Sequence, residues 1–550
     1  MWLRIPLRIW GLLSEELWRL TAITLAALCG LVAFAAGVRP LAEGQLGPMD
    51  ALRFMGLALV PMLQFTAPFA AGFASTLVYH RFAADNEHLA ASAGGVSHRS
   101  VLAPALIMGL VLGVIVAGLA HFVIPTFLRS MQELVTRDVA RMLVGSIERG
   151  DSVELNGLAI HADRAIRGED NPAIGVTDRI FLEGVVAYDA APDGSIEAEI
   201  AAERAEVLIS TDRSGIDAVT TVHMRLEGAV GKQQGQGLGE VGTIRRIGPW
   251  IVPNAFEENA RFYTFIQLGE LRNRPEQHND VDYLRRRLAS ELTKRRTERL
   301  LVAAIAGESR VVLTDALGQR LAIGADHIRR DGERWMLLPR EGELLDVDWA
   351  LSDGARRRQT AEVAWVSIRT ANTAGPALLT VELWQVGGRD VTGALRERLM
   401  IEQLRLASDP GADLYDLAPR RLLDEADVVI EQSMDDPEIE PVIVARVQLQ
   451  ERIDKLMREI TANHHERFAL ATACFLMTLT GAIIALRLRE GMPLQVYLWS
   501  FFPALAAVIT ISGGENAVAE NMVTGMMVLW GGVAALGVYT VFEYLRLRRH

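Results

Sequence analysis

Six apolar segments constrain the fold of this chain more than any other feature of its sequence. A helix needs about 20 mainly apolar residues to cross the hydrocarbon core of a bilayer. The segments that approach or exceed this length lie near residues 21–38, 54–79, 101–125, 468–486, 493–512 and 521–543. The long region 127–466 between the third and the fourth is mostly polar. The sequence therefore predicts three membrane spans, a large water-exposed region and three further spans.

The residues before the first span bear on whether that span is retained. The string AFAAG at 33–37 resembles a signal-peptide cleavage site, but residues 1–20 carry Trp2, Trp10 and Trp18 among arginines. Such a stretch is too long and too amphipathic for the start of a signal peptide. We expect an interfacial helix that leads into a retained span.

Lys and Arg residues near the segment ends set the orientation, because they favour the cytoplasmic side. One set of ends carries Arg4, Arg8, Arg19, Arg81, Arg99, Arg487, Arg489, Arg546, Arg548 and Arg549. The opposite ends carry Arg39 and Arg53, and no basic residue lies between Gly513 and Glu520. We therefore expect both termini and the 80–100 stretch in the cytoplasm and the region 127–466 on the outer side.

The outer region has the pattern of a β protein. From about 153, short alternating strands are separated by Gly, Asp and Pro turns, which is typical of an antiparallel sandwich, a jelly roll or an open barrel. LAIHADRAIR at 158–167 returns as LAIGADHIRR at 321–330, and each copy is followed by strand-like sequence and a charged helix. This predicts two tandem β modules, unless the similarity arose by chance. The expected divisions are 1–126, 127–306, 307–448 and 449–550.

Several classes of function are disfavoured. The net charge of −12 argues against a nucleic-acid-binding protein. Cys29 and Cys474 lie in apolar segments, which argues against a disulfide framework or a cysteine metal site. The sequence contains no GxxxxGK[ST], HExxH or GxSxG motif. We therefore predict no catalytic residue, no metal and no cofactor.

The polar stretch 77–104 lies between the second and third spans. Asp85 and Glu87 are placed to begin a short helix, whose positive N-terminus favours acids, and Gly94-Gly95 are placed to end it. A short amphipathic helix held between two spans is suited to docking onto a partner that supplies force.

Two arginines near the outer headgroups are candidates for lipid binding. Arg39 ends the first span and Arg53 begins the second. Each is either an anchor that snorkels to the interface or a guanidinium that meets phosphate on an anionic lipid. Glu515 and Glu520 in the opposite loop would either pair with these arginines or bind divalent ions that bridge such lipids.

The spacing in the polar stretch resembles that of the LptF/LptG family of lipopolysaccharide-export ABC transporter permeases. Arg81, Asp85 and Glu87 are followed by Gly95-Val96-Ser97 and then Pro104, in the order and spacing of the family signature. The segment 466–486, with Arg467 and Gly481, is similar to the family's entry into its fourth span. The resemblance covers about 1–240 and 449–550.

This resemblance implies a helical inner-membrane protein with a periplasmic β jelly roll. It implies that two permeases pair, as a homo- or heterodimer, on a cytoplasmic ABC ATPase dimer. Lipopolysaccharide or a similar glycolipid then passes to a periplasmic bridge protein. Glu87 would contact the ATPase, with Arg81, Asp85, Gly95 and Ser97 shaping the docked loop, and Arg39 would meet the phosphates of lipid A.

The chain also departs from the family pattern. A second β module at about 307–448 is not usual in the family, and prolines expected late in the fourth span and before the sixth are absent. The alternative function is a membrane-anchored scaffold or sensor that has a periplasmic binding domain and no transport role.

Overall fold

The computed structural model describes two compact units, residues 1–272 with 455–550 and residues 273–454. Within them, the described residues are 6–42, 48–136, 144, 147, 150, 152–155, 158–168, 178–190, 196–212, 219–233, 239–240, 244–251, 260–315, 318–332, 334–350, 356–370, 377–388, 396–409, 414–434 and 436–549. Each unit has its own hydrophobic core.

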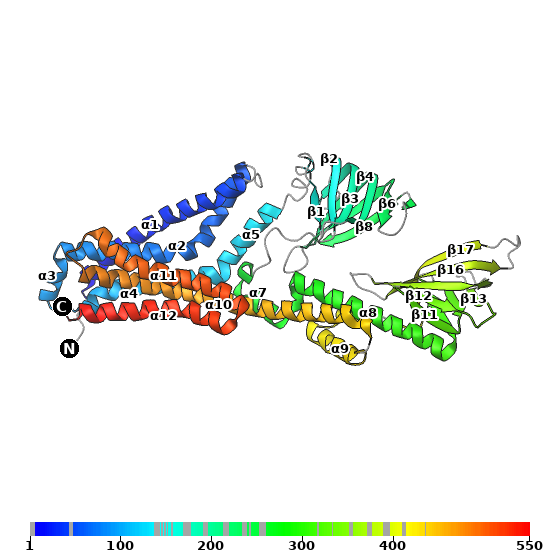
Figure 1. The fold of residues 1–550 in the computed structure, drawn as a ribbon. Coiled ribbons are helices and arrows are strands. Elements are labelled where there is room, and N and C mark those ends of the chain that lie inside the picture. The colour runs from blue at the N-terminus through cyan, green and yellow to red at the C-terminus, as the bar shows by residue number, and fades with distance from the viewer. Residues whose placement is uncertain are drawn as a thin grey trace. The chain divides into compact units, whose positions relative to one another are not determined.

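The first unit contains a bundle of long helices (Figure 1). Its members are α1 (Leu7–Ala42), α2 (Pro48–Ala84), α4 (His98–Gly118), α10 (Glu440–Arg487), α11 (Pro493–Glu520) and α12 (Met522–Leu547). A π-helical turn, η1 (Leu119–Val123), carries α4 into α5 (Ile124–Thr136). Six helices among the described residues are long and apolar enough to cross a membrane, which confirms the six predicted segments.

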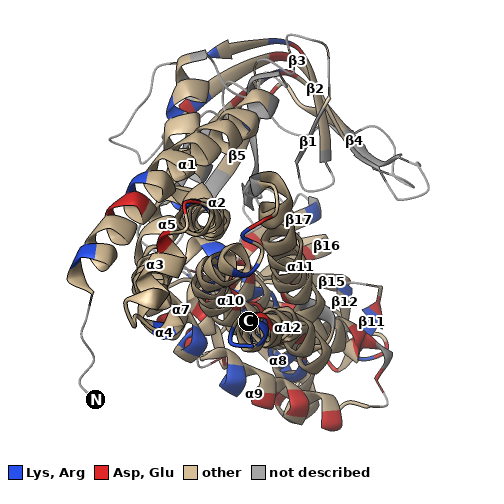
Figure 2. Ribbon diagram, turned by 90° about the vertical axis from the view of Figure 1, so that its left-hand side faces the viewer, with Lys and Arg blue, Asp and Glu red and all other residues tan. Residues whose placement is uncertain are grey.

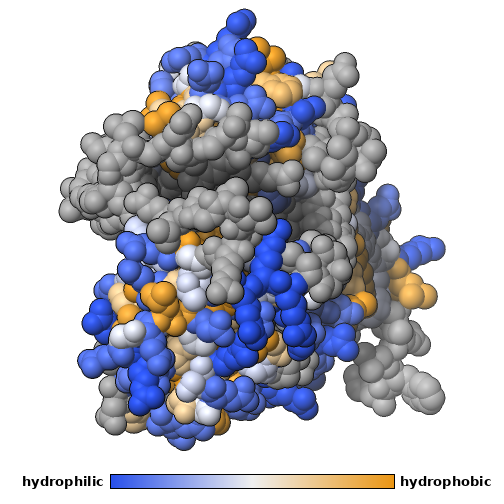
Figure 3. Space-filling model, turned by 90° about the vertical axis from the view of Figure 1, so that its right-hand side faces the viewer, coloured by the Kyte–Doolittle hydropathy of each residue, from blue (hydrophilic) through white to orange (hydrophobic). Residues whose placement is uncertain are grey.

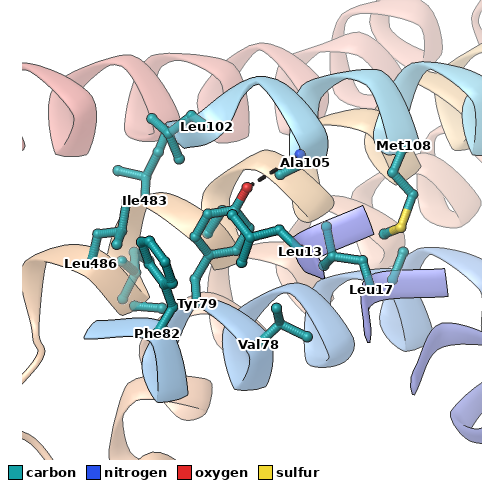
Figure 4. Close-up of a cluster of buried hydrophobic side chains, with 14 of the residues drawn as sticks. Leu13, Leu17, Val78, Tyr79, Phe82, Leu102, Ala105, Met108, Ile483 and Leu486 are labelled. Carbon is teal, nitrogen blue, oxygen red and sulfur yellow. Dashed lines mark hydrogen bonds between the residues drawn. The ribbon is translucent and has the colours of Figure 1, made fainter. Parts of the chain in front are cut away.

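The first helix differs from its predicted form. The segment expected to lie in the membrane interface and the first span form one continuous helix, α1. Leu13 and Leu17 are buried in the bundle core with Tyr79 of α2 and Met108 of α4 (Figure 4). Apolar contacts on one face of the segment therefore hold it against the bundle.

Many apolar side chains point outward from these helices, as a bilayer requires. Phe34, Val114, Phe502 and Val538 are each at least 60% exposed. Exposed residues of this size and spacing would be unfavourable in water but match a hydrocarbon environment.

Helix α10 is the centre of the bundle, since 78% of its most apolar window is buried, against 22–44% for the other five helices. A Cβ atom built on its Gly481 would lie 2.6 Å from the backbone oxygen of Gly72 in α2. Ser75 Oγ of α2 donates to the carbonyl of Thr478 at 2.7 Å. In lipid, helices associate through such close backbone packing and interhelical hydrogen bonds. Gly481 therefore allows the contact between α2 and α10.

The β part of the first unit is an antiparallel sheet. Its main path is β1 (Val153–Leu155), β2 (Leu158–Arg167), β3 (Asp178–Ala190), β4 (Ile196–Asp212), β5 (Val219–Glu227) and β8 (Ile244–Ile251), with each strand beside the next. Strands β6 (Val230–Gln233) and β7 (Gly239–Glu240) extend from β4. Alternation of buried Ile180 and Leu182 with exposed Phe181 gives one apolar face. The order along this path is that of a meander.

The second unit contains the other β domain. Its strands are β9 (Arg310–Thr314), β10 (Arg320–Gly324), β11 (His327–Asp331), β12 (Arg334–Leu338), β13 (Leu345–Ala350), β14 (Arg356–Ala361), β15 (Val363–Arg369), β16 (Leu378–Gly388) and β17 (Arg396–Leu406). Strand β16 pairs with both β14 and β17, so the ring β16-β14-β13-β10-β9-β17 is closed. The face of the molecule drawn in Figure 3 is mostly hydrophilic over its described residues, with small hydrophobic patches.

Helices begin and end the second unit. The expected division at residue 306 assigns helix α8 (Asn279–Glu308) to the first module, but its Leu301 and Ile305 pack into the core of the second sheet. The apolar residues at the C-terminal end of α8 therefore pack against the second sheet. Helix α9 (Pro419–Glu431) precedes α10, and Arg452 of α10 forms an ion pair of 2.8 Å with Asp280 at the start of α8. The entry and exit of this unit therefore lie side by side.

The sequence repeat does not correspond to a repeated arrangement of strands. LAIHADRAIR forms the single strand β2, whereas LAIGADHIRR is interrupted at Ala325-Asp326 and contributes to β10 and β11. The first sheet is a meander and the second contains a closed ring. Two β domains are present, as predicted, but their topologies differ.

We expect Gly481→Val to lower the stability of the bundle by about 1–3 kcal/mol, because its side chain would collide with the α2 backbone. Thermal unfolding in detergent measures this. Gly531→Ala is the control, since its added Cβ would meet nothing within 4 Å. Equal unfolding temperatures for Gly481→Val and the unchanged protein would contradict the packing role.

Candidate functional site

A short helical segment joins α2 to α4 and contains most of the predicted site. Helix α3 (Glu87–Ala93) follows a turn in which Asn86 has a φ of 60°, a left-handed conformation that asparagine tolerates. Gly95 has a φ of 81° and ends the segment, and Ser97 then caps α4 by accepting from the Ser100 amide at 3.4 Å. The prediction of a short helix ended by the glycine pair is confirmed.

Helix α3 and the turn before it expose two acids beside apolar and small residues. Asp85, Glu87 and Leu89 are exposed, whereas His88 and Ala91 are buried. Figure 1 places α3, the start of α1 and the end of α12 at the same end of the bundle, and Figure 2 views that end. The exposed acids therefore form a surface that a basic partner can contact.

A histidine pair supports the buried side of α3. The ring of His88 stacks on that of His98 in the first turn of α4, with centroids 5.2 Å apart, and Nε2 of His88 lies 3.2 Å from Nδ1 of His98. Burial lowers the pKa of His88, and the neighbouring His98 and Arg489 lower it further. A neutral imidazole at His88 is thus favoured at neutral pH.

Arg81 stabilises the segment in a way that the sequence did not indicate. It forms an ion pair of 3.1 Å with Glu16 of α1. Arg81, Asp85, Glu87, Gly95 and Ser97 all lie in or beside the α2–α4 connection, so the structure brings these predicted residues together.

The predicted lipid-binding arginines lie toward the other ends of α1 and α2. Arg53 is exposed near the start of α2. Arg39 belongs to the last turn of α1, and its side chain falls outside the described residues, as does that of Glu520. Glu515 pairs with Arg261, a residue that we did not single out from the sequence.

The sequence also did not point to the side chains that fix the base of the α3 segment. Trp10 Nε1 of α1 donates to the Ser100 carbonyl of α4 at 2.8 Å. The Tyr79 hydroxyl of α2 donates to the Val101 carbonyl at 2.9 Å and accepts from the Ala105 amide at 3.3 Å (Figure 4). Near these contacts, the sequence had drawn attention to Pro104, but only as the last position of the family signature.

A second polar cluster ties the chain that follows the first sheet to the bundle. Arg261, in the 3-10 turn η3 (Ala260–Phe262), donates through Nε to Glu515 of α11 at 2.9 Å and lies 3.7 Å from Glu466 of α10. Arg467 donates to the Tyr263 carbonyl at 2.9 Å. Glu466 and Arg467 are buried, so each charge needs an opposite charge nearby to offset the cost of its removal from water.

We expect Arg261→Met to destabilise the first unit by about 2 kcal/mol, because it leaves two buried carboxylates without this partner. The loss is below that of a fully buried pair, since the Arg261 side chain is 41% exposed. Thermal unfolding in detergent measures it, and the exposed Arg272→Met is the control. Adding Glu515→Gln should recover part of the loss. A double variant no more stable than Arg261→Met would contradict the pairing.

The sequence comparisons agree with these features. A family model described as the lipopolysaccharide export system permease LptF/LptG matches residues 19–217, which include the α3 segment and much of the first sheet. No curated protein matches the chain. The match over residues 19–217, with six membrane-length helices and the β domains, supports the LptF/LptG permease family for this chain.

Proposed function

We propose that the chain is a permease subunit of an ATP-driven exporter that extracts lipopolysaccharide, or a similar glycolipid, from the inner membrane. The observation that carries this proposal is the α3 segment, which exposes Glu87 at the start of α3 and Asp85 in the preceding turn, between two membrane-length helices. Drawing acyl chains out of a bilayer costs about 0.8 kcal/mol for each CH2 group. Since the sequence has no P-loop motif, the energy would come from a partner.

The proposed partner at α3 is a cytoplasmic ABC ATPase dimer. Glu87 lies in the first turn of α3 and is exposed, so its carboxylate is available to a basic group on the ATPase. Asp85 adds a second negative charge beside it. The Arg81–Glu16 ion pair, the left-handed Gly95 and the Ser97 cap hold both ends of the segment and support the role assigned to them.

The proposed topology places α3 and both chain termini in the cytoplasm, as the distribution of arginines favours. The β domains then lie in the periplasm, where a second permease subunit and a periplasmic bridge protein would complete the route. The resemblance assigns the passage of acyl chains to the inside of a β domain, and the inward face of the first sheet is apolar, with Ile180 and Leu182 buried in its core.

Arg39 and Arg53 are the proposed lipid-binding residues. A guanidinium forms paired hydrogen bonds with phosphate, which suits a phosphorylated glycolipid entering between the helices near the outer surface. The exposure of Arg53 supports this role.

We expect Glu87→Arg to release the ATPase, because it reverses the charge at the centre of the docking face. The measurement is copurification of the ATPase with the tagged, full-length permease. Glu490→Arg is the control, since its side chain is 90% exposed and lies outside α3. If the unchanged protein never copurifies with an ATPase, the transport function is wrong and the scaffold or sensor function is favoured.

Arg53→Glu should lower the stimulation of ATP hydrolysis by lipid A in proteoliposomes, because it repels the lipid phosphates. Basal hydrolysis should stay unchanged. Arg8→Glu, an exposed arginine near the opposite end of α1, is the control. Unchanged stimulation in Arg53→Glu would show that this arginine only anchors its helix.

A further inference from the structure

Pro104 interrupts the hydrogen bonding of α4 shortly after the α3 segment. In an α-helix each amide donates to the carbonyl four residues earlier, and proline has no amide hydrogen. Pro104 therefore leaves the Ser100 carbonyl without its intrahelical donor, and the proline ring crowds that carbonyl. A buried helix must satisfy such a carbonyl in another way.

Two other helices supply what α4 lacks at this point. Trp10 of α1 donates to the Ser100 carbonyl, which is the group that Pro104 leaves free. The Tyr79 hydroxyl of α2 bonds to the Val101 carbonyl and the Ala105 amide, two groups that pair with each other in a regular helix. Tyr79 is fully buried, so its hydroxyl depends on these bonds. One turn of α4 thus joins three helices.

We propose that Trp10 and Tyr79 are positioning residues that transmit displacement of the docked α3 segment to α1 and α2. This inference rests on the proposed function. The segment leads directly into α4 at Ser97, and the three hydrogen bonds lie within the next two turns. A shift of α4 relative to α2 would break the buried Tyr79 bonds, and a shift relative to α1 would break the partly buried Trp10 bond. The three helices therefore move together.

Neighbouring contacts strengthen this joint. Arg81 pairs with Glu16, which ties α2 to α1 less than one turn after Tyr79. His80 Nε2 lies 2.9 Å from the Gly491 carbonyl in the turn between α10 and α11. Cβ atoms built on Gly109 and Gly113 of α4 would lie 3.0–3.2 Å from backbone oxygens of α10, so α4 is also closely packed along its length.

The first experiment removes one hydrogen-bonding group at a time. Trp10→Phe and Tyr79→Phe keep an aromatic ring but lose the indole N–H and the hydroxyl. In the permease–ATPase complex in proteoliposomes, we expect ATPase copurification to stay unchanged. Stimulation of hydrolysis by lipid A should fall about fivefold, the equivalent of one buried hydrogen bond of about 1 kcal/mol. Controls are Trp18→Phe, on the same helix, and Tyr539→Phe, whose hydroxyl bonds to Trp499 in an exposed position.

A second experiment tests the role of Pro104 directly. Pro104→Ala restores the amide that bonds to the Ser100 carbonyl, so the Trp10 indole is no longer needed there. We expect Pro104→Ala to weaken stimulation by itself and Trp10→Phe to cause little further loss in that background. If the loss of stimulation in the double variant equals the product of the losses in Pro104→Ala and Trp10→Phe, the proposed link between the two residues is overturned.

A third measurement separates transmission of movement from general stability. Spin labels replacing the exposed Leu12 of α1 and Leu106 of α4 report whether the two helices move together. On ATP addition we expect the distribution of distances between the two labels to stay unchanged in the otherwise unchanged complex. We expect this distribution to broaden when Tyr79→Phe is added. If the ATPase binds and lipid A stimulates hydrolysis, but Trp10→Phe and Tyr79→Phe behave like the controls, only this inference fails. If no ATPase binds the unchanged protein, the proposed function fails with it.

Discussion

The backbone contact between α2 and α10 at Gly72 and Gly481 is the constraint on which both ends of the bundle depend. Lipid offers little hydrophobic driving force for helix association, so close packing and interhelical hydrogen bonds must supply it. Ser75 of α2 bonds to α10 in this contact, and Tyr79 lies one turn further along α2, where it meets α4. In the other direction along α10, Arg467 meets the chain that leaves the first sheet. The buried helix α10 therefore supports both the end of the bundle at α3 and the end from which the chain leads to the first sheet.

Features of this chain that depend on neighbouring residues were predictable from sequence, whereas contacts between distant residues were not. Membrane helices follow from local hydropathy, and α3 follows from acids at its start and glycines at its end, so both were predictable. Trp10 binds Ser100, and Arg261 binds Glu515, across long stretches of sequence that no local pattern connects. The ten-residue repeat predicted two similar β modules, and this was wrong about their topology for a related reason. The topology of a sheet is decided by which strands pair with one another, and a short repeat within one strand does not contain that information.

The α3 segment illustrates how a weak element can acquire a defined shape. A helix of seven residues is unstable alone, because helix nucleation fixes several residues for few hydrogen bonds. Here the Arg81–Glu16 pair precedes it, His88 stacks on His98 beneath it, and Ser97 caps the helix that follows. Its rigidity therefore comes from its neighbours. The positions of its exposed acids are therefore set by contacts that lie outside the helix itself.

The ion pair between Arg452 and Asp280 shows how the second unit is attached to the rest of the chain. It holds the point where the chain enters the second unit beside the point where the chain leaves it. Adjacent ends are what allow a domain to be inserted into, or excised from, a host protein without disturbing the host's own path. The second β domain also lies beyond the residues that the family model matches. The arrangement is that of an inserted domain whose last helix, α10, continues without a break as the most buried helix of the bundle.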